Sequence, residues 1–210
     1  LLYLILVLFC NTGSAQTLIE PFIGFAADIR QNQRLNMINT GVQFAFVKKS
    51  GYEFIVGAIQ GFGIKINGSD SSFTANPSLP IYSNAEKTVH AEFSGIYTNH
   101  RFRFFKTGKN QYVNFNFIAG IRMQRVVVNY SLSNPDYIVL NPETNYLRLG
   151  IYAGTGFEYI YLFKKGRIFF QSNIITPSIR RKREKINSFN QPVPFNFNLG
   201  YSFPLKKANK

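Results

Sequence analysis

The sequence predicts an all-β fold, an eight-stranded antiparallel up-and-down transmembrane β-barrel. Two observations predict it: apolar and polar residues alternate in eight segments, and the connections between these segments are short and long in turn. Strand side chains point to opposite faces in alternation, so each segment has an apolar face and a polar one. Most segments reach the roughly 9–11 residues that a tilted membrane strand needs. The segments lie at approximately 19–30, 38–48, 52–64, 87–105, 111–129, 145–163, 167–179 and 194–206.

An apolar run, LLYLILVLFC, precedes these segments. It is far shorter than the roughly 20 residues of a membrane-spanning helix, but it suits the apolar part of a secretory signal. Gly13 and Ala15 supply the small residues for cleavage before Gln16. The initiator and the basic start of such signals are missing. We therefore expect residues 1–15 to be a signal peptide truncated at its start, and residues 16–210 to form one β-barrel domain.

The connections indicate how the strands are arranged. Three are tight and contain glycine, which is typical of hairpin turns. They lie at 48–51 (KKSG), 105–110 (FKTGKN) and 163–167 (FKKGR). The other four are longer and rich in Asn, Ser, Pro and Asp, at 31–37, 65–86, 130–144 and 180–193. Strict alternation places all short turns and both chain ends at one end of a barrel and all long loops at the other, as in bacterial outer-membrane barrels. Within the second of these loops we expect an exposed, disordered segment.

Alternation alone does not say which face of the strands is wet. The last segment, PFNFNLGYSFPL, sets Phe and Leu against Asn, Gly and Ser, and the fifth and sixth segments repeat this pattern. The polar faces carry Gly, Asn, Gln and a few Arg and Glu, instead of the scattered Lys, Glu and Thr of a solvated surface. Such residues suit a crowded interior whose side chains bond one another. We therefore expect the polar face inside and the aromatic face in lipid; a soluble lipocalin-like barrel is the alternative.

The C-terminal strand resembles the signal that the outer-membrane assembly machinery reads. The matching positions are the polar Asn198, then Gly200, the aromatic Phe203 and the apolar Leu205, whereas Pro204 and the tail KKANK depart from the pattern. With this strand layout, the chain resembles the small eight-stranded barrels of the OmpA/OmpX-like superfamily. Its SAQ junction and its wealth of Asn, Tyr and Phe resemble the Bacteroidetes versions, which include PorT-like secretion proteins. The resemblance implies insertion in the outer membrane of a Gram-negative bacterium.

Charged residues also fall on the expected inner faces. We expect an interior cluster of Glu92, Arg122, Arg148 and Glu158, and Glu20, Asp28 and Arg30 also fall on inward faces. An eight-stranded barrel has room for little more than its own side chains, and buried charges need partners. This favours a structural cluster, with a narrow gated pore as the alternative.

The net charge of +14 lies wholly in residues 16–210. Export excludes nucleic acid as the partner and leaves outer-membrane lipids, lipopolysaccharide and other envelope components. A basic run opens the last long loop, and its side chains are candidates for lipopolysaccharide phosphates or for a merely solvated loop base. Its members are Arg180, Arg181, Lys182, Arg183 and Lys185. Lysines at the short turns are expected to meet phospholipid headgroups.

Catalytic and cofactor motifs are sparse. The two histidines are His90 and His100, and neither is followed two residues later by serine, as it is in lipid A deacylases. His90 and Glu92 form a conceivable base and its orienting acid. Cysteine pairs and Gly-rich phosphate loops are absent from the sequence, so no cofactor is expected. We expect a non-enzymatic barrel with a structural or surface-interaction role through its long loops; a narrow pore, a secretion accessory and a lipid A-modifying enzyme are the alternatives.

Overall fold

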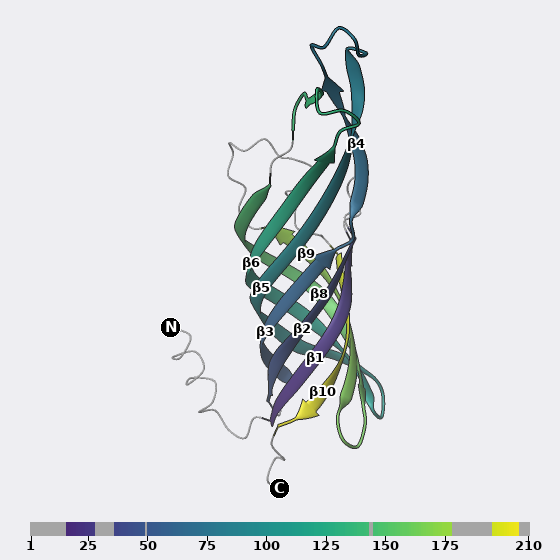
Figure 1. Cartoon of the computed structure of the whole chain (residues 1–210). Helices are drawn as coiled ribbons and strands as arrows, with labels where there is room; N and C mark the ends of the chain where they lie inside the picture. Colours follow the sequence, from purple (N-terminus) through teal and green to yellow (C-terminus); the bar gives the residue numbers. More distant parts are fainter. Residues whose placement is uncertain (1–15, 28–35, 49, 143–144, 178–194, 206–210) are drawn as a thin grey trace.

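The computed structural model describes residues 16–27, 36–48, 50–142, 145–177 and 195–205, without the side chains of Tyr146 and Arg148. Ten strands lie in this part of the chain, and eight of them close into a ring by antiparallel pairing of each strand with the next (Figure 1). The ring strands are β1 (Gln16–Ala27), β2 (Asn36–Val47), β3 (Tyr52–Gly63), β5 (Tyr82–Gly108), β6 (Gln111–Ser131), β8 (Tyr146–Leu162), β9 (Arg167–Pro177) and β10 (Phe195–Pro204). The pairs β3–β5 and β1–β10 complete the barrel, which confirms the predicted fold class.

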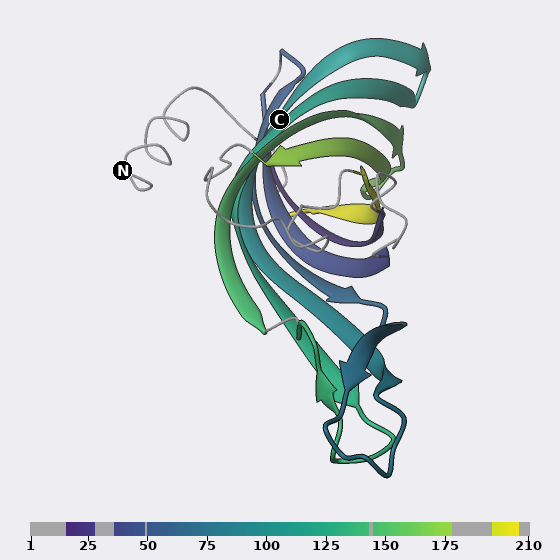
Figure 2. The same cartoon turned by 90° about the horizontal axis from the view of Figure 1, so that it is seen from above.

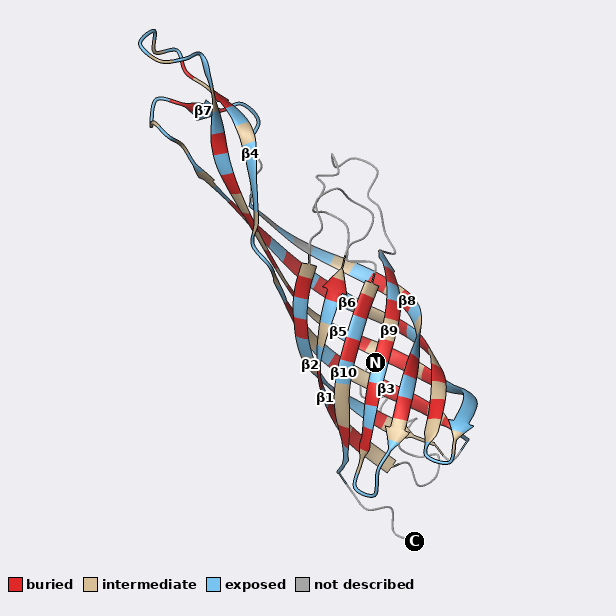
Figure 3. Cartoon of the chain, turned by 90° about the vertical axis from the view of Figure 1, so that its right-hand side faces the viewer, coloured by how far each residue is buried: buried red, intermediate tan, exposed pale blue. Residues whose placement is uncertain are grey.

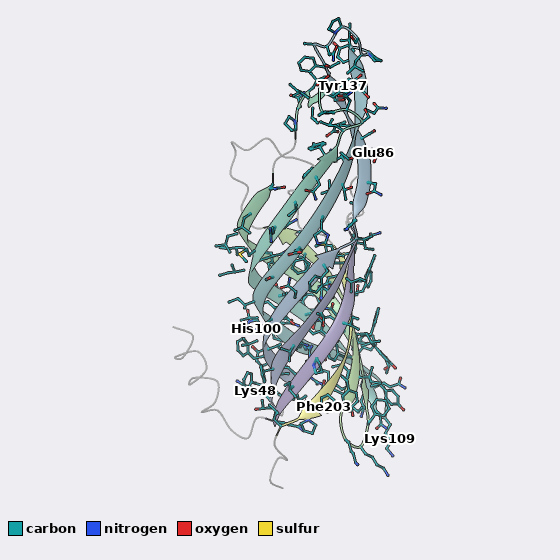
Figure 4. The ribbon with its side chains drawn as sticks, in the orientation of Figure 1. Lys48, Glu86, His100, Lys109, Tyr137 and Phe203 are labelled. Atoms are coloured by element: carbon teal, nitrogen blue, oxygen red, sulfur yellow. The ribbon has the colours of Figure 1, made fainter. Side chains whose placement is uncertain are left out.

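The three short turns lie together at one end of the barrel, where β1 also begins and β10 ends. Lys48, Lys109 and Phe203 mark this turn end in Figure 4. In the first turn the Lys48 amide donates to the Tyr52 carbonyl at 2.9 Å, and Gly51 adopts a φ of 86°, a conformation that favours glycine. The β5–β6 turn is less regular, with register shifts between Arg103 and Phe105 and between Lys106 and Gly108.

The structure shows which face of the barrel wall lies inside and which lies outside. On β10, Asn196, Asn198 and Ser202 are buried inside the ring, while Phe197 and Leu199 are exposed on the outer surface. The same alternation follows the other ring strands as bands of buried and exposed residues (Figure 3). A soluble barrel would have an apolar interior and a polar outside, the reverse of this arrangement. The chain is therefore a transmembrane β-barrel, with its apolar side chains in lipid. Among the described residues, no helix is long and apolar enough to cross a membrane.

Aromatic rings fill the space above interior glycines on neighbouring strands. A Cβ atom added to Gly57 would lie 2.5 Å from the Tyr97 ring, and one added to Gly61 would lie 1.9 Å from the Phe93 ring. Three further pairs of the same kind are Gly41 with Phe22, Gly120 with Tyr152, and Gly200 with Phe169. In each pair the missing side chain lets a large ring lie flat against the wall, so glycine and aromatic residues together set the packing of a narrow interior.

Beyond the loop end of the barrel, β5 and β6 continue as a projecting sheet. Two strands outside the ring, β4 (Ile66–Phe73) and β7 (Ile138–Val139), belong to it; β4 pairs with β5 over its full length, and β7 pairs with Ser72 and Phe73. Figure 2 shows the projecting sheet leaning away from the ring to one side. The prediction of a disordered surface loop at 65–86 was thus wrong. Strand propensity depends on context, and this polar segment is ordered by pairing along β5.

Candidate functional site

The strongest concentration of buried charge lies inside the turn-end half of the barrel. Three carboxylates and two guanidinium groups meet there, and all five side chains are at most 4% exposed. We call them the ionic cluster: Glu20 from β1, Glu53 from β3, Arg101 from β5, Glu158 from β8 and Arg167 from β9. Each occupies an inward position of its strand, and the tilt of the strands brings five separate segments to one level.

Arg167 binds two of the carboxylates in a fork. Its Nη2 atom donates to Glu20 Oε1 at 2.6 Å and to Glu53 Oε2 at 2.6 Å, and its Nε atom donates to Glu20 Oε1 at 3.1 Å. The Nη1 atom reaches the second oxygen of Glu53 and the Tyr112 hydroxyl, the latter at 3.0 Å. A planar guanidinium suits such multiple contacts better than an ammonium group.

Arg101 completes the ionic cluster. Its Nη1 atom donates to Glu20 Oε2 at 2.9 Å and to Glu53 Oε2 at 3.2 Å, and its Nη2 atom lies 2.7 Å from Glu158 Oε1. The side chain also lies over the Phe169 ring, 5.3 Å from its centroid. Glu20 and Glu53 are therefore shared between both arginines, whereas Glu158 contacts Arg101.

Neutral side chains from the remaining ring strands bond the same groups. Gln43 of β2 donates to Glu20 at 2.7 Å and accepts from the Tyr97 hydroxyl at 2.6 Å. Ser202 of β10 donates to Glu20, and Asn114 of β6 donates to Glu158 at 3.2 Å. Every one of the eight ring strands thus contributes a side chain. In so narrow a barrel this network occupies the lumen, and it links all the strands around the ring.

Three of the residues expected in the interior lie there, and two of them belong to the ionic cluster. Glu158 belongs to the ionic cluster, and so does Glu20, which the sequence had placed on the inner face. Arg122 is buried but nearer the loop end, with its guanidinium 3.8 Å from the centroid of the Phe93 ring. It lines a cavity of about 30 Å³ together with Tyr97 and Tyr152, and polar residues of β9 and β10 also line it. These are Gln171, Asn173, Asn196 and Asn198.

Glu92 does not lie in the interior, and its expected place in the cluster is corrected. Its neighbours Ala91 and Phe93 are buried inside the ring, so Glu92 faces outward, where its carboxylate lies 3.1 Å from His90 Nε2. The error arose because both faces of this strand mix polar and apolar residues. The two register shifts beside the β5–β6 turn also break the simple count from the neighbouring strand.

Other expected site residues lie outside the described part of the chain. These are the side chain of Arg148, the residues Asp28 and Arg30, and the basic run. The run comprises Arg180, Arg181, Lys182, Arg183 and Lys185. Its contact with lipopolysaccharide stays a prediction.

Sequence reasoning missed three members of the ionic cluster. Arg167 was counted within a turn, although it is the first residue of β9, and Glu53 is the second residue of β3. Arg101 was missed because placing Glu92 inside puts Arg101, which has the opposite parity on the same strand, on the outer face. The one signal in the sequence is weak: each of the three lies within a short turn or at most four residues from one, where a solvated charge would be more usual.

The strand expected to carry the assembly signal is β10. Asn198 points into the barrel and is 4% exposed, Gly200 packs against the Phe169 ring, and Phe203 and Leu205 are exposed outside at the turn end. Its recognition by the assembly machinery remains a prediction.

The expected base and orienting acid lie on the outer wall. His90 and Glu92 are in hydrogen-bond contact there, and the hydroxyls on either side of them on the same strand face are already bonded: Thr88 donates to Asn67 at 3.3 Å and Ser94 donates to Gln60 at 2.5 Å. Within the described ranges, no three His, Cys, Asp or Glu residues are placed to hold a metal ion. The geometry offers an outward polar pair without an activated nucleophile.

Comparison with known proteins gives fold neighbours alone. No family model matches the chain, and no curated protein matches it. The chain is similar to the N-terminal β-barrel domain of Pseudomonas aeruginosa OprF, with 12% identity, a TM-score of 0.46, and 90% of this chain and 99% of that chain covered. It is also similar to Ail, the attachment invasion locus protein of Yersinia pestis, with 6% identity, a TM-score of 0.46, and 91% and 99% covered. A structure of Ail from Yersinia pestis in complex with the heparin analogue sucrose octasulfate is similar as well, with 7% identity and a TM-score of 0.41. The match covers 90% of this chain and 97% of that chain.

Proposed function

We propose that this protein is a non-enzymatic outer-membrane barrel that binds a protein partner through its projecting sheet. The observation that carries the proposal is an exposed apolar row at the far end of that sheet. Tyr82, Phe73 and Ile138 are register partners on three adjacent strands, so their side chains share one face. Tyr82 is 67% exposed and Ile138 is 62% exposed. Apolar side chains gathered well above a membrane surface are typical of protein interaction sites.

The far end of the projecting sheet is well ordered for this role. The Thr74 amide donates to the Ile81 carbonyl at 3.0 Å, and the buried Tyr137 donates from its hydroxyl to the Pro80 carbonyl at 2.8 Å. Figure 4 shows Tyr137 within this end and Glu86 lower on the sheet. A preorganised surface loses little conformational entropy when it binds, which favours affinity.

An ion pair with a buried lysine holds the strands of the projecting sheet together below its far end. The Lys87 ammonium lies 3.1 Å from Asp70 Oδ2, and the Tyr130 hydroxyl donates to the same oxygen at 2.8 Å. These contacts join β4, β5 and β6. Among the described residues, the outer edge of β4 pairs with no strand over Ile66–Asp70, because β7 pairs only with Ser72 and Phe73 and the Leu140 amide donates to the Ser71 carbonyl at 3.1 Å. Open strand edges can accept a strand from another protein.

The contents of the interior favour a closed barrel and argue against a pore. The ionic cluster fills the lumen with bonded side chains from all eight ring strands, and it would have to be dismantled for ions to pass. Removing one partner from a buried ion pair costs about 3–5 kcal/mol, which makes spontaneous opening rare. The outer position of His90 and Glu92, with Ser94 bonded to Gln60, supports a non-enzymatic role.

A site-specific photo-crosslinking experiment in intact cells tests the proposal. In the test variant a photoreactive amino acid replaces Tyr82 in the apolar row. In the matched control it replaces Phe157, which is 54% exposed on the lipid-facing wall. We expect protein adducts from position 82 and none from position 157. A variant that keeps the photoreactive residue at position 82 but replaces Ile138 of the same apolar row by serine should still fold and reach the outer membrane but form fewer adducts. Absence of protein adducts at position 82 in cells that display the folded barrel would overturn the proposal.

A further inference from the structure

We infer that the turn-end mouth of the barrel binds an acidic segment of another protein. The lumen opens there into a pocket of about 320 Å³, lined by residues of seven of the eight ring strands or of their turns. Its floor consists of Arg167, Tyr112 and Ser202, which are buried and bond one another beside the ionic cluster. The pocket lies at the opposite end of the barrel from the projecting sheet, so the inference does not rest on the partner proposed above (Figure 1).

One side of the pocket is cationic. Arg103 of β5 lies over the Tyr112 ring of β6, with its guanidinium carbon 4.4 Å from the ring centroid. On its other side it lies against the first short turn, because a Cβ atom added to Gly51 would lie 3.3 Å from Arg103 Cβ. Lys164 and Lys165 of the β8–β9 turn are exposed and line the same pocket. Within the described part of the chain, no ion pair joins these three cations to an acid.

The acids of the barrel do not neutralise this cationic side. The ionic cluster holds three carboxylates against two guanidinium groups, so it balances at most one of the three cations. The other acids of the described residues lie toward the loop end or on the projecting sheet. They are Asp70, Glu86, Glu92 and Asp136. A positive surface without exposed acids attracts negatively charged segments and speeds their association.

The opposite side of the pocket is apolar. Leu18 of β1, Val47 of β2 and Pro204 of β10 line it, and these three strands are neighbours in the ring. Cations that face apolar side chains suit a ligand in which carboxylates and apolar groups occur together. A simple ion would leave the apolar side in water, and the pocket has the size of a site for an organic group. An acidic peptide that also carries apolar side chains has the matching composition.

The position of the pocket favours a protein segment over a lipid headgroup. Membrane lipids lie against the outer wall, whereas Leu18, Tyr112 and Ser202 are at most 6% exposed inside the ring. A lipid would have to leave the bilayer to fill the pocket. A protein segment reaches the mouth directly from the aqueous side.

A peptide titration of the folded barrel in phosphatidylcholine bicelles tests the inference. The probe is the acetylated peptide Asp-Leu-Asp-Trp-Asp-Leu, whose tryptophan fluorescence is free of background because the protein contains no tryptophan. The matched peptide has asparagine in place of each aspartate, and empty bicelles give the signal of peptide bound to lipid alone. We expect saturable binding of the acidic peptide, at least about tenfold tighter than that of the asparagine peptide and weakened by salt.

Variants identify the pocket as the binding site. Arg103→Gln should weaken binding of the acidic peptide about tenfold, as expected for one lost charge-assisted hydrogen bond. The double variant Lys164→Gln, Lys165→Gln should weaken it as well, and it carries the test if Arg103→Gln does not fold. Lys109→Gln is the matched control, because it removes an exposed cation at the same end that does not line the pocket. Electrophoretic mobility with and without boiling checks the folding of each variant.

Three results would overturn the inference. The first is equal affinity for the acidic and the asparagine peptides. The second is an equal effect of the pocket variants and Lys109→Gln. The third comes from bicelles that also contain phosphatidylglycerol: if this lipid abolishes binding of the acidic peptide, the pocket cations belong to lipid headgroups and not to a protein segment.

Discussion

Arg167 and Glu20, 147 residues apart in the chain, meet inside the barrel through two contacts of 2.6 Å and 3.1 Å to the same carboxylate oxygen. The contact joins β1 to β9 on the inner side of the wall, past β10, which lies between them. It can form only when the barrel has closed, because β10 lies between β1 and β9 in the ring. The ionic cluster is therefore a product of closure and holds the closed state.

Replacing Arg167 by methionine should destabilise the folded barrel by about 3–5 kcal/mol, since Glu20 and Glu53 would remain buried without this partner. Urea unfolding of the protein in lipid vesicles measures the change in the free energy of unfolding. Tyrosine fluorescence or circular dichroism follows the transition, since the sequence contains no tryptophan. Lys165→Met, at an exposed position two residues earlier, should change the free energy of unfolding by less than about 0.5 kcal/mol. Equal stability of the two variants would contradict a cohesive role for the ionic cluster.

The barrel should show no steady ion conductance in planar bilayers. Arg122→Gln should leave it closed as well, because the ionic cluster lies in the turn-end half of the lumen and does not include Arg122. Reproducible single-channel steps from the wild-type protein, in preparations free of other porins, would instead favour the narrow pore. The double variant Arg101→Ala, Arg167→Ala identifies whether such steps pass through the ionic cluster.

Adding a side chain at Gly57 should be costly. Valine there places its Cβ atom 2.5 Å from the Tyr97 ring, and overpacking of this kind costs about 1–3 kcal/mol. Gly68, on the exposed part of β4, has no heavy atom within 4 Å of an added Cβ, so Gly68→Val serves as the control. The midpoint of urea unfolding should fall for the first variant alone.

An arginine on the outer wall distinguishes a membrane barrel from a soluble one. Phe117 is 45% exposed in the central part of β6, and Phe117→Arg should cost about 2–4 kcal/mol in a bilayer. Tyr82→Arg, on the projecting sheet, should cost little because that position is in water. In a soluble barrel both exposed positions would accept arginine equally well, so similar unfolding free energies would argue against lipid contact.

The alternation of the strands and the spacing of the turns were sufficient to predict the barrel. Both depend on local chemistry: side-chain parity within a strand, and glycine at tight turns. The inner and outer faces were predicted correctly wherever one face was clearly apolar, as on β6, β8 and β10. On β5 both faces are mixed, and the placement of Glu92 failed there.

The ionic cluster was harder to predict because its members are distant in sequence. Nothing near Arg167 in the chain indicates Glu20 or Glu53, and only ring closure and strand tilt bring them to one level. The β4 strand was missed for a related reason. Its residues have weak strand propensity, and they are ordered by β5, whose own length was underestimated.

The unbroken course of β5 also has a mechanical consequence. Its 27 residues run from the turn end to the projecting sheet, roughly 90 Å of continuous strand. A partner that pulls on the far end along the strand would load the β5–β6 ladder in shear, so that many backbone hydrogen bonds resist the force at once. The tension would enter the barrel wall directly, without an intervening hinge, and the closed ring would anchor the tether.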